Sequence, residues 1–305
     1  MSRATLSRLL GRFCVDLGKG DYRDSVFLAG SGRSGTTWLS QVIDHSGGYR
    51  YVFEPFNPAR VGAVGNFRSK QYLRPGDARE EFLGPARLVL TGEIKNFWTD
   101  RFNGKLVARR RLIKDIRANL LLGWMRAHFP GMPIILLLRH PCAVVASRLA
   151  LGWRDNLEET MEQEALVEDF LRPMEAEIRA ARDDFERHLF LWCIDNFVPL
   201  RQLGPGEIHL AFYENLLVNP EDELKGLFDF LGEETDQRAY DRLRRPSALS
   251  RKGAPLPSVD GWRARVSGRR LERAGEILGL FGLDRVYGKG PMPDPSGARA
   301  IMEGI

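Results

Sequence analysis

A glycine-rich turn near the start of the chain carries the residues best suited to binding an anion. It reads Gly30-Ser-Gly-Arg-Ser-Gly35 and is followed directly by Thr36 and Thr37. The apolar run at 26–29 predicts a buried strand before the turn, and apolar residues at helical spacing predict a helix from Thr36 to about His45. A strand, a glycine turn and a helix N-terminus together form a cradle whose backbone N–H groups face a bound anion.

The turn departs from the nucleotide loop of kinases at one informative position. That loop reads G-x-x-x-x-G-K-[ST]; Gly30, Gly35 and Thr37 fit it, but Thr36 occupies the lysine position. Without this lysine, the site is poorly equipped to hold β- and γ-phosphates bridged by Mg²⁺. Arg33, inside the turn, still suits a smaller anion held by loop amides, hydroxyls and one guanidinium fork. A glycine/serine turn that binds nothing is the plainer alternative.

The same segment resembles the 5′-phosphosulfate loop of the sulfotransferases that use 3′-phosphoadenosine 5′-phosphosulfate (PAPS). Their loop reads [KR]-S-G-T-[TS], often followed by Trp, and residues 33–38 match this pattern. The resemblance implies that the loop binds the 5′-phosphate of PAPS and that its tryptophan stacks on the adenine. The implied nucleotide-binding residues here are Arg33, Ser34, Gly35, Thr36, Thr37 and Trp38.

A second anion site is expected where the clearest buried strand of the chain, at 133–138, ends at Arg139. Ser147 lies eight positions further on, two turns into the helix expected there, so both side chains can converge on one anion. An Arg-x₇-Ser pattern directly after an apolar strand resembles the 3′-phosphate signature of the sulfotransferases. Without the phosphate loop, the same pair would be a loop arginine and a helix serine.

Two further segments complete the implied nucleotide site. The triplet Arg251-Lys252-Gly253 resembles the one that clamps the 3′-phosphate in cytosolic sulfotransferases, although Trp262 follows it at a longer spacing than in those enzymes. Tyr213 opens a Tyr-Glu-Asn-Leu segment that resembles the element of the family whose tyrosine lies beside the adenine. A buried aromatic residue at a strand end would have the same composition.

Glu54 is the leading candidate for a general base. It follows a short strand expected at 49–53 and precedes Pro55, and open α/β sheets bind their ligands at such strand ends. Its position resembles that of the base in carbohydrate and tyrosylprotein sulfotransferases, and the carbohydrate enzymes share its Phe-Glu-Pro tripeptide. The resemblance implies that Glu54 takes the proton of an acceptor hydroxyl. A solvated loop glutamate is the alternative.

Lys114 lies near the end of a strand expected at 111–116. It resembles the lysine that contacts the transferring sulfonate in cytosolic sulfotransferases, where a histidine base follows closely. Here Asp115 follows in place of a histidine, which favours Glu54 as the base and leaves Asp115 as the second candidate. Lys114 and Arg33 are thereby implied to hold negative charge on the sulfonate. A surface cation at a strand end is the plainer alternative for Lys114.

Composition limits the remaining classes of function. The 305 residues, 43% hydrophobic and 28% charged, predict a globular protein with a sizeable core. A net charge of +5 suits an anionic small ligand, but no basic tract with interleaved aromatic residues points to nucleic acid. The three cysteines lack CxxC spacing, so we expect reduced thiols and no metal site. No apolar run reaches the ~20 residues of a membrane span and no signal peptide is recognisable, so we expect no membrane segment and a cytoplasmic location.

We therefore expect a single α/β domain over 1–305, with a three-layer, P-loop-like fold and a central, mainly parallel sheet flanked by helices. Its core is expected at about 25–283, after a lead-in at 1–24 and before a loose tail at 287–305. The resemblance implies sulfuryl transfer from PAPS, without a metal, to a hydroxyl of a carbohydrate or small-molecule acceptor. An ATP-dependent P-loop kinase and a non-catalytic nucleotide-binding protein are the alternatives. No oligomeric state is predicted.

Overall fold

The computed structural model describes residues 14–247 and 258–305, and its central element is a five-stranded sheet. The strand order is β3-β5-β2-β6-β7, and every neighbouring pair is parallel. These strands are β2 (Ser25–Gly30), β3 (Tyr49–Phe53), β5 (Arg110–Asp115), β6 (Ile134–Leu138) and β7 (His209–Phe212). A separate parallel pair joins β1 (Val15–Asp16) to β4 (Val107–Ala108). The expected α/β fold with a parallel central sheet is confirmed.

Helices connect the strands and cover both faces of the sheet. On the way from β2 to β7 they are α2 (Thr36–Ile43), α3 (Glu80–Leu90), α4 (Leu122–His128), α5 (Pro141–Ala150), α6 (Leu157–Met161), α7 (Glu164–Leu166), α8 (Glu175–Arg179) and α9 (Asp184–Gln202). After β7 come α10 (Tyr213–Val218), α11 (Pro220–Leu231), α12 (Gln237–Leu243), α13 (Gly268–Leu280) and α14 (Pro295–Glu303). A short 3₁₀ turn, η4 (Asn119–Leu121), precedes α4.

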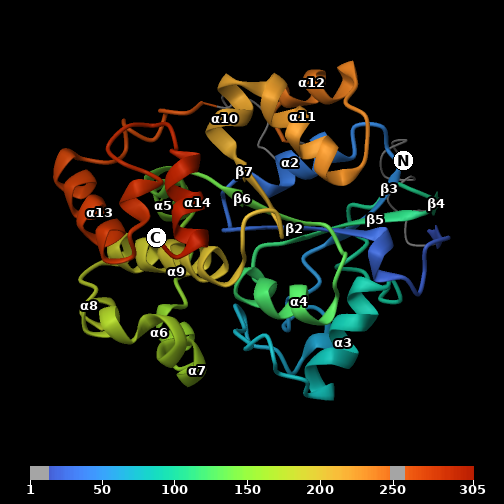
Figure 1. The fold of residues 1–305 in the computed structure, drawn as a ribbon, viewed down its shortest axis with the longest axis horizontal. Helices are drawn as coiled ribbons and strands as arrows, with labels where there is room; N and C mark the ends of the chain where they lie inside the picture. Colours follow the sequence, from blue (N-terminus) through green and yellow to red (C-terminus); the bar gives the residue numbers. More distant parts are fainter. Residues whose placement is uncertain (1–13, 248–257) are drawn as a thin grey trace.

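The three layers follow from alternation along the buried strands. In β2, Phe27 and Ala29 belong to one hydrophobic cluster, while Val26 and Leu28 belong to another on the opposite face. Figure 1 shows α2, α10, α11 and α12 over one side of the sheet and α3, α4 and α9 on the other. Because both faces are covered, the strands are apolar throughout, as is usual for a parallel sheet.

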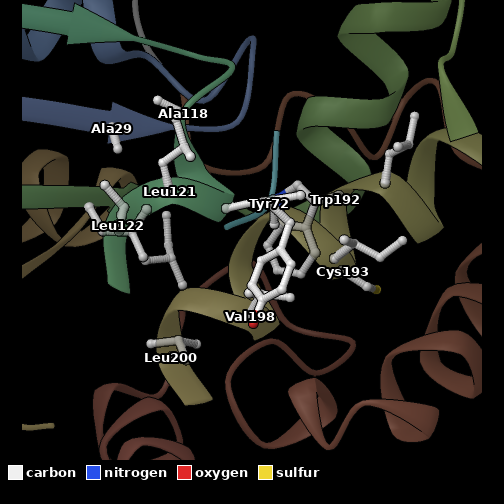
Figure 2. Close-up of a cluster of buried hydrophobic side chains, with 14 of the residues drawn as sticks. Ala29, Tyr72, Ala118, Leu121, Leu122, Trp192, Cys193, Val198 and Leu200 are labelled. Carbon is white, nitrogen blue, oxygen red and sulfur yellow. The ribbon is translucent and has the colours of Figure 1, made fainter. Parts of the chain in front are cut away.

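The larger cluster gathers side chains that lie far apart in the sequence. Figure 2 shows Ala29 of β2 near Leu121 and Leu122 of the η4–α4 turn, together with Trp192 and Val198 of α9. All five side chains are fully or almost fully buried. This packing holds the central strand against α9 and so fixes one wall of the edge where β2 ends.

Local signals explain where two of the helices that follow strands begin. α2 begins after Gly35, which adopts φ = +104°, a left-handed conformation that glycine takes without strain. α5 begins with Pro141 at its first position, and the His140 side chain caps it by accepting from the Cys142 amide at 3.2 Å. Both helices therefore start directly at the carboxyl edge of the sheet.

The expectation of a loose tail at 287–305 is wrong. Helix α14 lies in this segment, and its Ala298 and Ile301 belong to the larger core cluster, as does Tyr287. Figure 1 shows α14 beside α9, in agreement with the contacts between these two helices. The glycines and prolines that suggested a loose tail instead delimit the helix, because Pro295 opens it and Gly304 ends it in a left-handed conformation.

The expected lead-in also contributes to the core from residue 14 onward. The Asp16 carboxylate is buried between Arg50 and Arg111, at 3.2 Å and 2.8 Å. These ion pairs tie β1 to β3 and β5 of the central sheet. Residues 1–13 lie outside the described part of the chain.

Candidate active site

The largest concentration of predicted site residues lines one cleft of about 370 Å³ at the carboxyl edge of the sheet. Its walls come from the glycine turn, the ends of β3 and β5, and the segments after β6 and β7. The lining residues are Arg33, Gly35, Thr36, Thr37, Trp38, Phe53, Glu54, Lys114, Ile116, Arg117, Arg139, Trp153, Tyr213, Pro246 and Ser247. Parallel strands all end at this edge, which is why residues so distant in sequence meet here.

The glycine turn requires glycine for its shape. A Cβ on Gly35 would lie 2.8 Å from the Tyr213 ring, and one on Gly30 would lie 2.8 Å from the Leu137 carbonyl oxygen. Arg33 also has a positive φ, +81°. No side chain caps the N-terminus of α2, so the positive end of the helix dipole is left facing the cleft. This is the backbone arrangement that favours a bound anion.

The second predicted anion site joins the first. The Nε of Arg33 donates to Ser147 Oγ at 3.0 Å, and a guanidinium nitrogen of Arg139 donates to the Arg33 carbonyl oxygen at 3.2 Å. The Arg139 guanidinium also lies over the Tyr213 ring, 4.0 Å from its centre. The structure thus brings Arg33, Arg139 and Ser147 together, with two cations side by side in an arrangement suited to an anionic ligand.

Glu54 and Lys114 form a buried ion pair at the ends of neighbouring strands. Phe53 is paired with Lys114 in the sheet register, so Glu54 emerges beside the lysine, and the Nζ to Oε1 distance is 2.6 Å. Arg117 donates to the other carboxylate oxygen, also at 2.6 Å. Burial alone would raise the pKa of Glu54, but the charges of Lys114 and Arg117 outweigh it and hold this pKa below its ordinary value. The carboxylate is therefore ionised at neutral pH and able to accept a proton.

The backbone at Glu54 is strained. Its φ is +42°, which is uncommon for any residue other than glycine. Two hydrogen bonds hold the Glu54 backbone in this conformation. The Glu54 amide donates to the Lys114 carbonyl at 2.7 Å, and the Trp98 indole donates to the Glu54 carbonyl at 3.0 Å. Left-handed backbone at a non-glycine residue is often a feature of functional sites.

Asp115, the second candidate for the base, has a different place. It is fully buried and does not line the cleft. Its two carboxylate oxygens accept from the amides of Phe56 and Arg117, at 2.8 Å and 2.7 Å, and burial raises its pKa to about 6. Asp115 therefore positions the two loops that carry Glu54 and Arg117.

Sequence reasoning missed Arg117. Nothing in its surroundings resembles a family motif, although its place two residues after the end of β5 puts it at the correct edge. Only the turn after Asp115 directs it back towards Glu54.

Aromatic residues form the other end of the cleft. Trp38 packs against Tyr213 with ring centres 5.1 Å apart, and its indole nitrogen donates to the carbonyls of Leu243 and Arg245. Trp262 does not join them: it stacks on His140, with ring centres 4.2 Å apart, and is absent from the cleft lining. The predicted residues Arg251, Lys252 and Gly253 lie outside the described residues.

Comparison with known proteins assigns the chain to a family. A model described as "Sulfotransferase family" matches residues 25–237, which is most of the chain. The chain belongs to the sulfotransferase family. Sulfuryl transfer is therefore the supported reaction class, and a P-loop kinase is set aside. No curated protein matches.

Several solved sulfotransferases are similar in structure. Mouse sulfotransferase SULT7A1, solved with PAP, is 14% identical, with 98% of this chain and 95% of that chain covered and a TM-score of 0.49. The sulfotransferase domain from the curacin biosynthetic pathway is 16% identical, with coverages of 92% and 96% and a TM-score of 0.43. A sulfotransferase from Alicyclobacillus acidocaldarius is 15% identical, with coverages of 90% and 98% and a TM-score of 0.45.

The described residues show neither a candidate metal centre nor a membrane-spanning helix. Within 14–247 and 258–305, no group of three or more His, Cys, Asp or Glu side chains is placed to hold a metal ion. In the same ranges, no helix is both long enough and apolar enough to cross a bilayer.

Proposed function

We propose that this sulfotransferase transfers the sulfuryl group of PAPS to a hydroxyl of a carbohydrate or small-molecule acceptor. The observation that carries the proposal is the shared cleft, in which the Glu54–Lys114 pair faces the same space as the glycine turn and Arg139. A base, a cation for the sulfonate and an anion cradle are the groups that such a reaction needs.

The residues present fit the donor. Ser34 Oγ is buried in the glycine turn and has no hydrogen-bond partner within the described part of the chain. The turn amides, Thr36 and Thr37 would hold the 5′-phosphate, Arg139 with Ser147 the 3′-phosphate, and the Trp38–Tyr213 wall the adenine. Bound PAPS supplies a sulfuryl group attached to a phosphate leaving group.

The chain itself supplies proton transfer and charge stabilisation. The carboxylate of Glu54 accepts the proton of the acceptor hydroxyl as that oxygen attacks. Lys114 lies 2.6 Å from this carboxylate and, with Arg33, holds the negative charge of the transferring group and of the departing phosphate. Trp98 and Asp115 keep the loops of Glu54 and Arg117 in place through the backbone contacts described above.

Calorimetric titration with 3′-phosphoadenosine 5′-phosphate (PAP), with ADP and ATP as comparators and EDTA present, tests the donor site. We expect PAP to bind tightest and Arg139→Ala to weaken it by at least about tenfold, because a charged contact to the phosphate is lost. Arg172→Ala, at an exposed arginine paired with Glu175, is the matched control and leaves binding unchanged. Tighter binding of ATP than of PAP, seen only when Mg²⁺ replaces the EDTA, would contradict the proposal.

A further inference from the structure

A second pocket of about 200 Å³ adjoins the cleft. Ile116, Arg117 and Trp153 line both spaces, so the two meet at the residue that contacts Glu54. The full lining is Gly32, Ser69, Lys70, Ile116, Arg117, Arg148, Trp153, Arg154, Asn156, His188 and Leu191. An acceptor whose hydroxyl reaches Glu54 past Arg117 would extend into this pocket.

The lining carries four cations and no carboxylate. The cations are Lys70, Arg117, Arg148 and Arg154. Arg154 is exposed at the rim, while Lys70 and Arg148 are buried. The nearest acidic residue in sequence to the rim, Asp155, is paired with Arg187 at 2.8 Å. The pocket therefore presents positive charge to whatever enters it.

The buried charges behind the pocket do not balance. Asp195 is the carboxylate partner of both Lys70, which it contacts directly, and Arg148, at 3.7 Å. This group of two cations and one carboxylate carries a charge of +1. The pair of Lys114 and Arg117 differs, because the carboxylates of both Glu54 and Asp115 lie beside it. Burial lowers the pKa of Lys70 to about 8, so it is still mostly protonated at pH 7. An excess buried charge is unfavourable until an anion compensates it.

The remaining lining adds an aromatic ring and a hydrogen-bond acceptor. Trp153 packs on the Gly32 backbone so closely that a Cβ there would lie 2.6 Å from the ring. His188 Nε2 lies 3.0 Å from the Trp153 carbonyl oxygen, so this nitrogen carries the proton of the neutral ring. His188 Nδ1 is buried and lacks a partner among the residues described, which leaves an acceptor for a ligand hydroxyl.

We infer that this pocket binds an anionic group of the acceptor, a carboxylate or a phosphate or sulfate ester, carried on the same molecule as the reacting hydroxyl. The inference rests on the proposed function, because it places the acceptor beside Glu54. It narrows the acceptor from any hydroxyl compound to an acidic one. Arg117 links the two spaces, contacting Glu54 on one side and lining the cationic pocket on the other.

The test is calorimetric titration of the full-length protein saturated with PAP, so that the nucleotide cleft is filled. Glucuronate, glucose 6-phosphate and glucose 6-sulfate are the probes, and glucose is the neutral comparator. We expect at least one anion to bind about tenfold tighter than glucose. The anion that binds tightest shows whether the pocket prefers a carboxylate, a phosphate ester or a sulfate ester. Arg154→Gln and Lys70→Gln should each lower the affinity for that anion, relative to glucose, by about tenfold.

Matched controls keep the two proposals separable. Arg172→Gln, an exposed arginine outside the pocket, should keep the preference for the anion. If Lys70→Gln fails to fold because Asp195 loses a partner, the rim variant Arg154→Gln carries the test alone. Equal binding of glucose and all three anions, or an anion preference untouched by the folded pocket variants, would overturn the inference while PAP binding still supports the proposed function. Failure of PAP to bind would instead contradict the proposed function, and the inference with it.

Discussion

At the scale of single residues, the carboxylate of Glu54 combines backbone strain with two close cations. Its φ of +42° is maintained by hydrogen bonds from Trp98 and to Lys114. Its two oxygens are each 2.6 Å from a cationic nitrogen. Such a group is ionised over the whole neutral range, and its basicity is set by how strongly Lys114 and Arg117 hold it.

Replacing Glu54 with Gln should lower kcat by about 10²–10⁴-fold, because a general base is lost while the shape of the cleft is kept. PAP affinity, measured by calorimetry, should change little. Glu272→Gln, on the exposed surface of α13, is the control and should leave kcat as it is. Full activity of Glu54→Gln would show that the base lies elsewhere or that the acceptor needs none.

Arg117→Gln should shift the pH dependence of kcat. In the unaltered protein the pKa of Glu54 is held below its ordinary value of 4.5, so the acid limb of the profile lies below that pH. Removing one positive charge raises this pKa, and the acid limb should move to higher pH. Steady-state kinetics between pH 4 and 8, at saturating acceptor, measure the shift. An acid limb that does not move would mean that Glu54 does not control this limb.

At the scale of elements, the junction of the glycine turn with α2 combines an anion cradle with tight packing. Gly35 makes both features possible. Its φ of +104° lets the chain enter α2, and its missing side chain admits the Tyr213 ring, against which Trp38 packs. The glycine turn and the aromatic wall of the cleft therefore pack as one unit.

Gly35→Ala should destabilise the protein by about 1–3 kcal/mol and weaken PAP binding, because both the backbone conformation and the contact with Tyr213 resist a Cβ. Urea denaturation and calorimetry measure the two effects. Gly275→Ala is a matched control in the middle of α13, where a Cβ meets nothing within 4 Å, and should stabilise by about 0.5–1 kcal/mol. Equal behaviour of the two variants would contradict this account of the turn.

At the scale of the whole molecule, the C-terminal segment completes the core below the sheet. Helix α14 packs on α9, and α9 carries Asp195, which supports the second pocket. The support of the second pocket thus depends on a helix that packs against the C-terminal segment.

Ile301→Ala should lower the free energy of unfolding by about 2–4 kcal/mol, because a buried side chain is truncated and leaves a cavity. Ile305→Ala removes the same atoms from a residue that is 76% exposed, and should change stability by less than about 0.5 kcal/mol. Urea denaturation of both variants measures the difference. If both substitutions changed the free energy of unfolding by equally small amounts, the C-terminal helix would not be packed in the core.

The sequence by itself determined the parts of this protein that local signals encode. The strand, glycine turn and helix at 25–43 are specified by adjacent residues, as are Arg139 at the end of β6 and the helix that follows. Even the meeting of Glu54 with Lys114 could be anticipated, because residues at the ends of parallel strands share an edge.

Only the tertiary structure decided the strand order, the closeness of Arg117 to Glu54 and the position of α14. It also decided the second pocket, since Lys70 comes from an irregular segment and pairs with Asp195, 125 residues away. Such contacts leave no periodicity in the sequence, because they depend on which surfaces pack together after the elements have formed. Here the sequence determined where the glycine turn and its helix N-terminus lie, and the packing of distant segments decided which charges surround Glu54 and the second pocket.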